Sequence, residues 1–318
     1  MEKVLLTVVI SAYNVDKYLH QCMKGLIDDR LSESIEVIIV NDGSTDNTST
    51  IAETYSGYSN VRIINQENGG LASVFNAGIR EAKGKYWLSL DGDDAINTEE
   101  MVSFISEIRD INVDLIVFPK TVFDDSREKR EQLVPSKPGL FLYEDEVLDP
   151  PFIHNSVYLT QLLKEHVLVE EEFRLYADGP FVLYTIPHIN NCISVDRAIY
   201  RYRYSQEQSV SVRSLIRNKK DLYGTTWNMI DFYIHNSHVS KKRYLLMEKL
   251  IYARIRTMYF IALFENDMSI YELNEQLLKT APDLYEKSPY IVKIIRSNVS
   301  PINWLIRKMY TIGKSIVR

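Results

Sequence analysis

The chain has 318 residues and a net charge of −6, and 45% of its residues are hydrophobic, which is enough for one large or two modest domains with a packed core. Cys22 and Cys192 lie far apart and outside any Cys/His cluster, which excludes a disulfide framework and a cysteine-based zinc site. Polar residues follow the apolar run 4–10 at once, and no stretch reaches the roughly 20 uncharged apolar residues of a membrane span. We therefore expect a strand at 4–10 and a cytoplasmic protein.

The first hundred residues alternate between patterns typical of strands and of helices. Short runs rich in β-branched and aromatic residues predict strands at 4–10, 35–40, 61–64 and 86–90. Helical spacing between them predicts helices at 16–27, 45–55 and 71–82. Strands that alternate with helices over short connections favour an α/β fold, with a parallel sheet covered on both faces.

The rest of the chain has a less regular pattern. We expect a strand at 114–118, a mobile polar loop at 124–137 and a helix around 156–165. After residue 215 the pattern is mainly helical. We therefore expect two regions, 1–214 and 215–318.

Polar residues collect where the first four predicted strands end. They occupy 11–14, 41–46, 65–70 and 91–94. Each stretch alone is explained by turn and capping chemistry, which favours Asn, Asp, Gly and Ser. Because ligands of parallel α/β sheets bind at the carboxyl ends of the strands, the four stretches together predict one binding crevice.

The fourth stretch, Asp91-Gly92-Asp93-Asp94, holds three carboxylates on a tight turn after an apolar strand. Clustered carboxylates at the end of a buried strand are costly unless a cation compensates their charge. Oxygen ligands without nearby His or Cys suit Mg²⁺ or Mn²⁺ better than Zn²⁺. The turn therefore predicts a site for a divalent cation.

In their order and spacing, these motifs resemble those of the family 2 glycosyltransferases, which have the A-type nucleotide-sugar transferase fold. The motifs are Val8 to Asn14, Val40 to Asp46, Asn68-Gly69-Gly70-Leu71-Ala72 with Asn76 and Gly78, and Asp91 to Asp94. The resemblance implies a Rossmann-like, mostly parallel sheet with helices on both faces, here followed by a helical C-terminal region. It also implies transfer of a hexose from a UDP-sugar to a bacterial surface glycan, such as a capsule, a wall polymer or the glycan of an adhesin.

The resemblance assigns expected roles to single residues. Ser11 and Tyr13 would border the nucleotide base, and Asp42 would accept a hydrogen bond from uracil N3. Asn68 and Gly69 would let the backbone approach the nucleotide, which Gly allows because it has no side chain. Asp91 would reach the ribose or a metal-bound water, and Asp93 would bind the Mn²⁺ or Mg²⁺ directly, so that Asp91 and Asp93 form the metal motif.

Members of this family that invert the anomeric centre use an aspartate as the base near the acceptor hydroxyl, often in a Glu-Asp-x-x-Phe string. The corresponding string here is Ala177-Asp178-Gly179-Pro180-Phe181. Asp178 is therefore the predicted catalytic base. A capping or turn carboxylate is the alternative interpretation.

Several positions depart from the family pattern. Phe75 stands where an Arg is common, Ala177 replaces the Glu, and Gln206 and Gln208 replace the Arg or His of a loop that folds over the diphosphate. Arg203 or Arg213 is a candidate substitute for that cation. His154 and Asn155 fall where acceptor contacts often lie, and we interpret them as ordinary loop residues. These departures motivate an alternative function, a catalytically weak subunit that binds UDP and supports a partner enzyme.

The two regions carry opposite charge. Residues 215–318 contain 17 Lys and Arg against 9 Asp and Glu, whereas residues 1–214 are acidic. Beyond Glu286 basic residues alternate with apolar ones, which is typical of a segment that contacts an anionic membrane, here the inner face of the plasma membrane, where a glycan or glycolipid acceptor would be found. Packing on the same protein or on a second copy in a homo-oligomer remains the alternative. The acidic region and the lack of a base-reading motif argue against a nucleic-acid partner.

Overall fold

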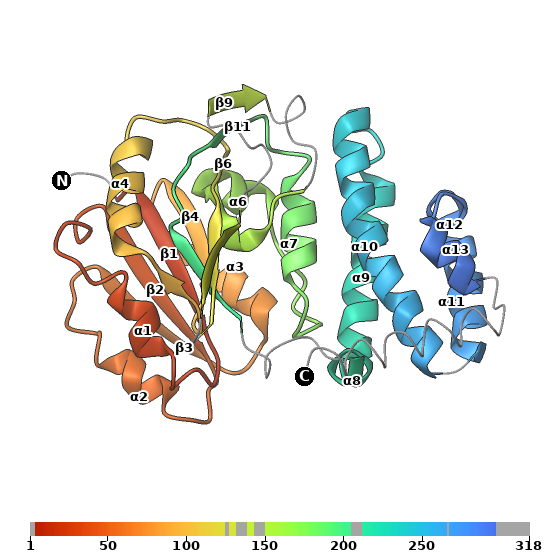
Figure 1. Cartoon of the computed structure of the whole chain (residues 1–318), viewed down its shortest axis with the longest axis horizontal. Helices are drawn as coiled ribbons and strands as arrows, with labels where there is room; N and C mark the ends of the chain where they lie inside the picture. Colours follow the sequence, from red (N-terminus) through yellow and green to blue (C-terminus); the bar gives the residue numbers. More distant parts are fainter. Residues whose placement is uncertain are drawn as a thin grey trace. The chain divides into compact units, whose positions relative to one another are not determined.

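The computed structural model describes residues 4–124, 127–131, 139–142, 150–204, 212–265 and 267–296. The chain divides into two compact units, Met1–Ser209 and Val210–Arg318. The first unit contains the sheets and the second contains helices (Figure 1).

The first unit is built on a mostly parallel sheet. Among the described residues its strands pair in the order β3-β2-β1-β4-β10-β6-β11-β9. The parallel part consists of β1 (Leu6–Ala12), β2 (Ile35–Asp42), β3 (Val61–Gln66) and β4 (Tyr86–Asp91). In the register of this part, Val8 of β1 lies between Val37 of β2 and Leu88 of β4. All three side chains are fully buried, as expected for strands that are covered on both faces.

Helices cover both faces of this sheet (Figure 1). On one face, α1 (Leu19–Lys24) and α4 (Thr98–Ile108) share a buried apolar cluster with β1, β2 and β4, and α2 (Thr48–Glu53) packs against β2. On the other face, α3 (Leu71–Glu81) approaches β1 so closely that a Cβ at Gly78 would lie 2.5 Å from Val9 Cγ1. The predicted α/β class with a doubly covered, mostly parallel sheet is confirmed.

The second half of the sheet differs from the expectation. The helix expected at 156–165 begins only at Thr160, because Ser156–Leu159 forms strand β10, which is followed by α6 (Thr160–His166). Strand β10 runs antiparallel between β4 and β6 (Leu115–Val117). A short apolar run is compatible with a strand or a helix. Here it forms a strand, because its backbone groups pair with those of the two neighbouring strands. The sheet continues through β11 (Asn191–Ser194) to β9 (Gly139–Leu142).

A smaller sheet follows the acidic turn. It contains β5 (Ala95–Ile96), β12 (Tyr200–Arg203), β7 (Lys120–Phe123) and β8 (Glu128–Glu131) in that order. Part of the stretch expected to be a polar loop is therefore the strand β8, and residues 125, 126 and 132–137 lie outside the described residues. The pairing of β12 with β5 brings Tyr200 and Arg203 to the turn that holds Asp91 to Asp94.

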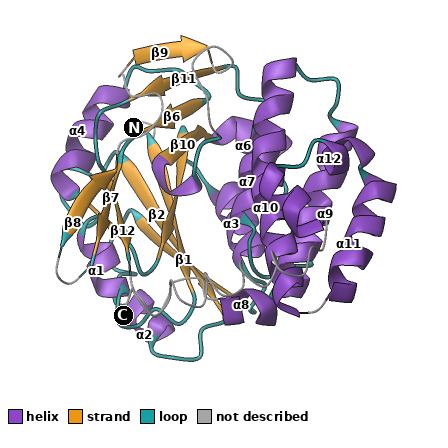
Figure 2. Cartoon of the chain, turned by 45° about the vertical axis from the view of Figure 1, so that its right-hand side comes forward, coloured by secondary structure: helices purple, strands orange, loops and turns teal. Residues whose placement is uncertain are grey.

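The second unit is helical, as predicted (Figure 2). Its helices are α8 (Val212–Arg217), α9 (Lys219–His235), α10 (Lys241–Glu265), α11 (Asp267–Thr280), α12 (Pro282–Glu286) and α13 (Tyr290–Arg296). Helix α10 packs against α9, α11 and α13 and buries Ile255, Met258 and Tyr259. None of the described helices has both the length and the apolar composition needed to cross a membrane. Most of the predicted basic segment, from residue 297 onward, lies outside the described residues.

Candidate active site

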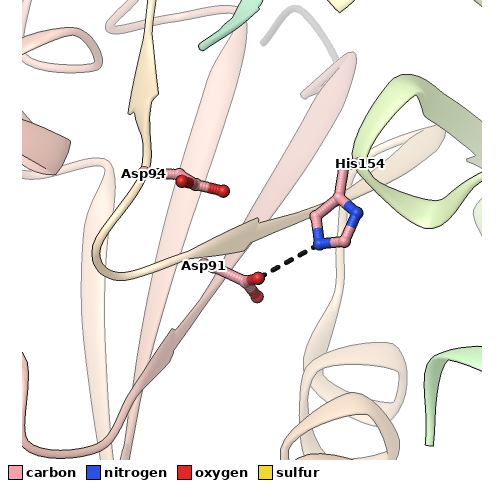
Figure 3. Close-up of side chains that lie close together, drawn as sticks. All are labelled: Asp91, Asp94 and His154. Atoms are coloured by element: carbon pink, nitrogen blue, oxygen red, sulfur yellow. Dashed lines mark hydrogen bonds and ion pairs between the residues drawn. The ribbon is translucent and has the colours of Figure 1, made fainter. Parts of the chain in front are cut away.

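Asp91 ends β4 and lies at the centre of the candidate site. Its carboxylate accepts a hydrogen bond from Ser11 Oγ of the neighbouring strand β1 at 3.0 Å. The other carboxylate oxygen lies 3.1 Å from His154 Nε2. Figure 3 marks this contact with a dashed line. His154 comes from the short 3-10 helix Ile153–Asn155, which precedes β10. Burial opposes ionisation of Asp91, but the hydrogen bonds from His154 and Ser11 lower its pKa below the usual value.

Asp94 lies on the same turn and is only 2% exposed. The Tyr200 hydroxyl donates a hydrogen bond to one of its carboxylate oxygens at 2.6 Å, and the Arg203 backbone N–H donates to the other at 2.6 Å. Burial, together with the negative charges of Asp91 and Asp93, raises the pKa of Asp94 to about 8. Burial and the neighbouring carboxylates thus both disfavour the ionised form of Asp94.

Asp91, Asp94 and His154 form a group that fits a divalent cation. Each offers one ligand atom, and these atoms lie within 4.8 Å of one another. A cation at this point would counter the repulsion that, after burial, contributes to the raised pKa of Asp94. The two carboxylates offer the oxygen ligands that Mg²⁺ and Mn²⁺ prefer, and the imidazole adds a nitrogen ligand.

Asp93, the predicted direct metal ligand, is not part of that group. Its carbonyl oxygen accepts a hydrogen bond from Arg203 Nε at 2.7 Å. Its carboxylate is close enough to contribute to the raised pKa of Asp94. The role of Asp93 in metal binding thus stays a prediction, and the geometry adds Asp94 and His154 to Asp91 as candidate ligands.

The sequence placed Asp94 in the acidic turn without naming it as a ligand, and it did not identify His154 as a candidate ligand. Asp94 stands in the acidic motif, and only its contact with Asp91 and His154 distinguishes it from Asp93. His154 lies 63 residues after Asp91 along the chain and has no motif around it. No local sequence signal identifies His154, because its proximity to Asp91 depends on the position of β10 beside β4.

Asp42 ends β2 and holds the third motif in place. Its two carboxylate oxygens accept hydrogen bonds from the backbone N–H groups of Gly69 at 2.9 Å and Gly70 at 2.8 Å. Gln66 Nε2 donates a third bond at 2.7 Å. Asp42 is therefore more than a simple turn residue. Because an ionised carboxylate has about four acceptor positions, Asp42 keeps capacity for one further donor, such as the predicted uracil N–H.

The remaining predicted nucleotide contacts lie around these strand ends. Ser11 contacts Asp91, as described above. Tyr13 follows β1 directly, and 49% of its surface is exposed, which leaves its ring accessible for stacking. Asn68 packs beside Gly43, where an added Cβ would lie 2.6 Å from the Asn68 backbone nitrogen. The ends of β1, β2 and β4 thus bring residues of three separate motifs to one edge of the sheet.

Asp178 is the first residue of α7 (Asp178–Thr185) and is half-buried. Burial alone would lower the pKa of His154, but the carboxylates of Asp91, Asp94 and Asp178 together raise it. Asp178 also contributes to the raised pKa of Tyr202 in β12, which burial raises most. The predicted base thus lies within electrostatic reach of the group around Asp91.

The residues that depart from the family pattern have defined positions where the structure describes them. Phe75 is 1% exposed and packs in an aromatic cluster with Trp87 and Phe181, so this position serves the core. Ala177 is also buried. Arg203, one candidate for the missing loop cation, stacks between the rings of Tyr18 and Phe123 while it holds the acidic turn. The side chain of Arg213 and residues 205–211 lie outside the described residues.

Comparisons with known proteins agree with this architecture. The sequence profile "Glycosyl transferase family 2" matches residues 7–166, half of the chain. An uncharacterized glycosyltransferase of Bacillus subtilis, EpsJ, is 28% identical over 217 residues, which cover 63% of this chain and 61% of the relative. The minor teichoic acid biosynthesis protein GgaB of the same organism is 25% identical over 261 residues, which cover 77% of this chain and 28% of the relative. The chain therefore spans less than two thirds of the length of these relatives.

A solved structure supports the fold. The crystal structure of S. aureus TarS residues 1–349 in complex with UDP-GlcNAc superposes with a TM-score of 0.64 at 18% sequence identity. The superposition covers 88% of this chain and 83% of the TarS chain. At that identity, the likeness establishes the arrangement of the sheet and helices.

Proposed function

The chain belongs to glycosyl transferase family 2, and on that premise we propose that it transfers a sugar from a UDP-sugar to a hydroxyl group of a bacterial surface glycan, with inversion at the anomeric carbon. The names of two similar proteins support the substrate classes. TarS was solved with UDP-GlcNAc, and GgaB is named for teichoic acid biosynthesis. A capsule, a wall polymer and the glycan of an adhesin are the acceptor types that we consider.

One observation carries this proposal. Side chains from separate elements meet at the end of β4, where Asp91, Asp94 and His154 form a group with Asp178 in electrostatic reach. This arrangement provides a candidate site for a cation together with a candidate proton acceptor. Transfer of a sugar from a nucleoside diphosphate to a hydroxyl group requires that the charge of the leaving diphosphate is compensated and that the hydroxyl proton is removed, and these two sites would supply both functions.

The donor would lie along the ends of β1, β2 and β4. We propose that Ser11, Tyr13 and Asp42 contact the nucleotide base. The backbone at Asn68 and Gly69 would approach the nucleotide closely. Asp91, Asp94 and His154 would hold Mn²⁺ or Mg²⁺, with Asp93 as a further predicted ligand. The bound cation would neutralise negative charge that develops on the leaving diphosphate.

Asp178 would act on the acceptor. Its carboxylate takes the proton of the acceptor hydroxyl while the hydroxyl oxygen attacks the anomeric carbon and the bond from that carbon to the diphosphate breaks. Attack from the face opposite the leaving group inverts the anomeric configuration. A base in this position typically contributes about 10²- to 10⁴-fold to the rate.

The first prediction concerns this base. Asp178→Asn should lower turnover by about 10²- to 10⁴-fold and leave UDP affinity unchanged, because the amide cannot accept the proton but keeps the shape of the side chain. Turnover of a panel of UDP-sugars with Mn²⁺ measures the first effect, and calorimetry with UDP measures the second. Asp110→Asn, at an exposed position of the same unit, is the matched control.

Two results would contradict the proposal. An Asp178→Asn variant with wild-type turnover would remove the base role. Donor turnover that is unaffected by EDTA would remove the metal assignment, even if transfer itself is observed.

Phe75 and Ala177 favour a second candidate function, a glycosyltransferase-like subunit that binds UDP and supports a partner enzyme. Both side chains are buried and apolar where the family often has a cation and an acid. For such a subunit, calorimetry would show UDP binding while no UDP-sugar is turned over in the presence of Mn²⁺.

We also propose a division of labour between residues 1–214, which would bind the nucleotide-sugar, and residues 215–318, which would contact the membrane surface, the acceptor or a second copy of the chain. The opposite charges of the two regions support this division. Membrane contact would place the enzyme at the inner face of the plasma membrane.

A further inference from the structure

Residues 167–177 connect α6 to α7 and end directly before Asp178; we name this segment the strap. The strap contains no regular helix or strand, yet several of its residues are fixed by neighbouring elements. Val169 is 2% exposed and Phe173 is 8% exposed. Because Asp178 follows the strap immediately, the position of its carboxylate depends on how the strap is held.

Asn76 of α3 holds the beginning of the strap. Its side-chain amide exchanges two hydrogen bonds with the backbone of Val169: Asn76 Oδ1 accepts from the Val169 N–H at 3.0 Å, and Asn76 Nδ2 donates to the Val169 carbonyl at 2.8 Å. Asn76 Nδ2 also donates to Glu171 Oε1 at 2.8 Å. Asn76 is 7% exposed, so these bonds lie mostly out of water, where breaking them is costly.

The start of α3 holds the strap at a second point. The backbone N–H of Leu71 donates to the carbonyl of Arg174 at 3.0 Å. Gly70 has a φ of 82°, and a Cβ added there would lie 2.3 Å from Arg174 Cα. The same Gly70 donates its N–H to Asp42, so the proposed nucleotide turn and the strap share one contact point.

The end of the strap is constrained as well. Tyr176 has a φ of 64°, an unusual conformation for a residue with a side chain. Ala177 is 1% exposed, and its carbonyl accepts the N–H of Phe181 in the first turn of α7. Tyr184 of α7 donates its hydroxyl hydrogen to Glu170 at 2.7 Å. The strap is therefore held at several points between Val169, which Asn76 contacts, and Asp178.

We propose that Asn76 is a positioning residue for the transfer reaction, which acts by locking the strap and thereby fixing the Asp178 carboxylate relative to the acceptor hydroxyl. This inference rests on the proposed role of Asp178 as the base. Asn76 itself contacts the strap and takes no part in proton transfer. A small displacement of a reacting group is costly to the rate, even when the displaced contact is distant from the chemistry.

Kinetics test this role. Asn76→Ala removes all three hydrogen bonds and should lower kcat by about 10- to 100-fold, while KM for the UDP-sugar changes by less than about twofold, since the nucleotide contacts remain. Glu171→Ala, at an exposed position, removes only one of these bonds and should lower kcat by a smaller factor. Glu172→Ala removes an exposed carboxylate of the same strap and is the matched control, with wild-type kcat expected.

A rescue experiment separates positioning from general loss of stability. Asn76→Asp keeps the acceptor for the Val169 N–H but places a second carboxylate beside that of Glu171. The two negative charges repel each other, so kcat should fall. Adding Glu171→Gln to Asn76→Asp supplies an amide donor to that carboxylate and should restore part of kcat. Failure of the second substitution to raise kcat would contradict the proposed contact.

Proteolysis provides a readout that needs no donor sugar. Arg174 is exposed, and trypsin cleaves after Arg only where the backbone can leave its native position. The rate at which a new Leu175 terminus forms, followed by mass spectrometry, should rise at least about fivefold in Asn76→Ala, since the strap loses its anchor, and should stay unchanged in Glu172→Ala.

The two readouts distinguish failure of this inference from failure of the proposed function. Cleavage of Asn76→Ala at the wild-type rate, or an effect confined to KM, overturns the positioning role of Asn76. Faster cleavage of Asn76→Ala combined with a wild-type protein that turns over no UDP-sugar supports the lock on the strap and overturns the proposed function.

Discussion

At the scale of single residues, the candidate site depends on a few charged side chains whose neighbours differ from one residue to the next. Asp91 and Asp94 stand three positions apart on one turn, yet His154 and Ser11 lower the pKa of Asp91 against the effect of burial, whereas burial and its acidic neighbours raise that of Asp94. Two residues of the same type thus acquire different properties from their surroundings. An added cation would act on both at once.

The second prediction concerns His154. His154→Ala removes one of the three candidate ligands and should weaken Mn²⁺ binding by at least about tenfold, because each ligand also orients the others. Titration of Mn²⁺ into the protein, followed by calorimetry or electron paramagnetic resonance, measures the affinity. The exposed His238→Ala variant controls for nonspecific loss of an imidazole. Equal affinity in His154→Ala and wild type would rule out His154 as a ligand.

The third prediction concerns an exposed ion pair. Hydrogen bonds from Arg30 lower the pKa of Asp28 to about 2. Since this lies below the unfolded value of about 3.9, the pair stabilises the fold above that pH, and its contribution disappears as the pH falls through about 2. Asp28→Asn should therefore lower the free energy of unfolding at pH 7 and have a much smaller effect at pH 2, as measured by urea unfolding.

The neighbouring Asp29→Asn is the control for this pair. It removes an exposed carboxylate beside Asp28, and at pH 7 it should change the free energy of unfolding by less than Asp28→Asn does. An Asp28→Asn effect that is the same at pH 7 and pH 2 would contradict the assignment.

At the scale of elements, a buried acid joins several parts of the first unit. Glu36 of β2 accepts a hydrogen bond from Thr7 of β1 at 2.6 Å and from the backbone N–H of Lys83 before β4. Arg62 of β3 supplies the positive charge of this set of contacts around Glu36, with Nη2 3.1 Å from the Glu36 carboxylate. The Glu36 carboxylate, whose negative charge Arg62 compensates, thus connects the strands that carry the site.

The fourth prediction tests this set. Arg62→Ala leaves the nearly buried Glu36 carboxylate without its cation and should lower the free energy of unfolding by about 1–3 kcal/mol. Chemical denaturation of the whole protein measures this change. Arg80→Ala, which removes an exposed guanidinium from α3, is the control and should change stability by less than about 0.5 kcal/mol. Similar stability of both variants would show that Glu36 needs no cation.

At the scale of the whole molecule, charge is distributed unevenly along the sequence. Residues 215–318 carry 17 Lys and Arg against 9 Asp and Glu. In the described part of the basic segment, α13 exposes Tyr290, Ile291 and Lys293 and buries Val292 and Ile295. Exposed aromatic and apolar side chains next to basic ones suit an interface with anionic lipid.

The fifth prediction concerns this surface. Replacing Lys293, Arg307 and Lys308 by Glu should abolish flotation with vesicles that contain anionic lipid, because it reverses the charge that would attract them. Neutral vesicles should not float even the wild-type protein, and salt should weaken the binding. The same number of charge reversals at the exposed Lys24, Lys83 and Lys129 is the control. Flotation that survives the first set of substitutions would show that other residues bind the lipid, and a wild-type protein that does not float with anionic vesicles would favour the alternative of an oligomer contact.

The local patterns of the sequence gave correct positions for the main elements of the first hundred residues. The strands Leu6–Ala12 and Tyr86–Asp91 lie within two residues of the expected ranges, and the third helix ends one residue earlier than expected. The helices before it are shorter than the expected ranges, because turns occupy their ends. Residues 156–159 were expected in a helix and form a strand, since pairing with β4 and β6 outweighs local preference.

The sequence by itself determined the α/β class, the acidic turn and the polar ends of β1, β2 and β4, because apolar spacing and turn chemistry are encoded within a few neighbouring residues. The tertiary structure decided which of these residues meet. It alone places His154 beside Asp91. It also brings the Gly69 and Gly70 amides to the Asp42 carboxylate and the strap before Asp178 to Asn76. Such contacts join residues distant in the chain, and strand order and helix packing fix them, which no local pattern specifies.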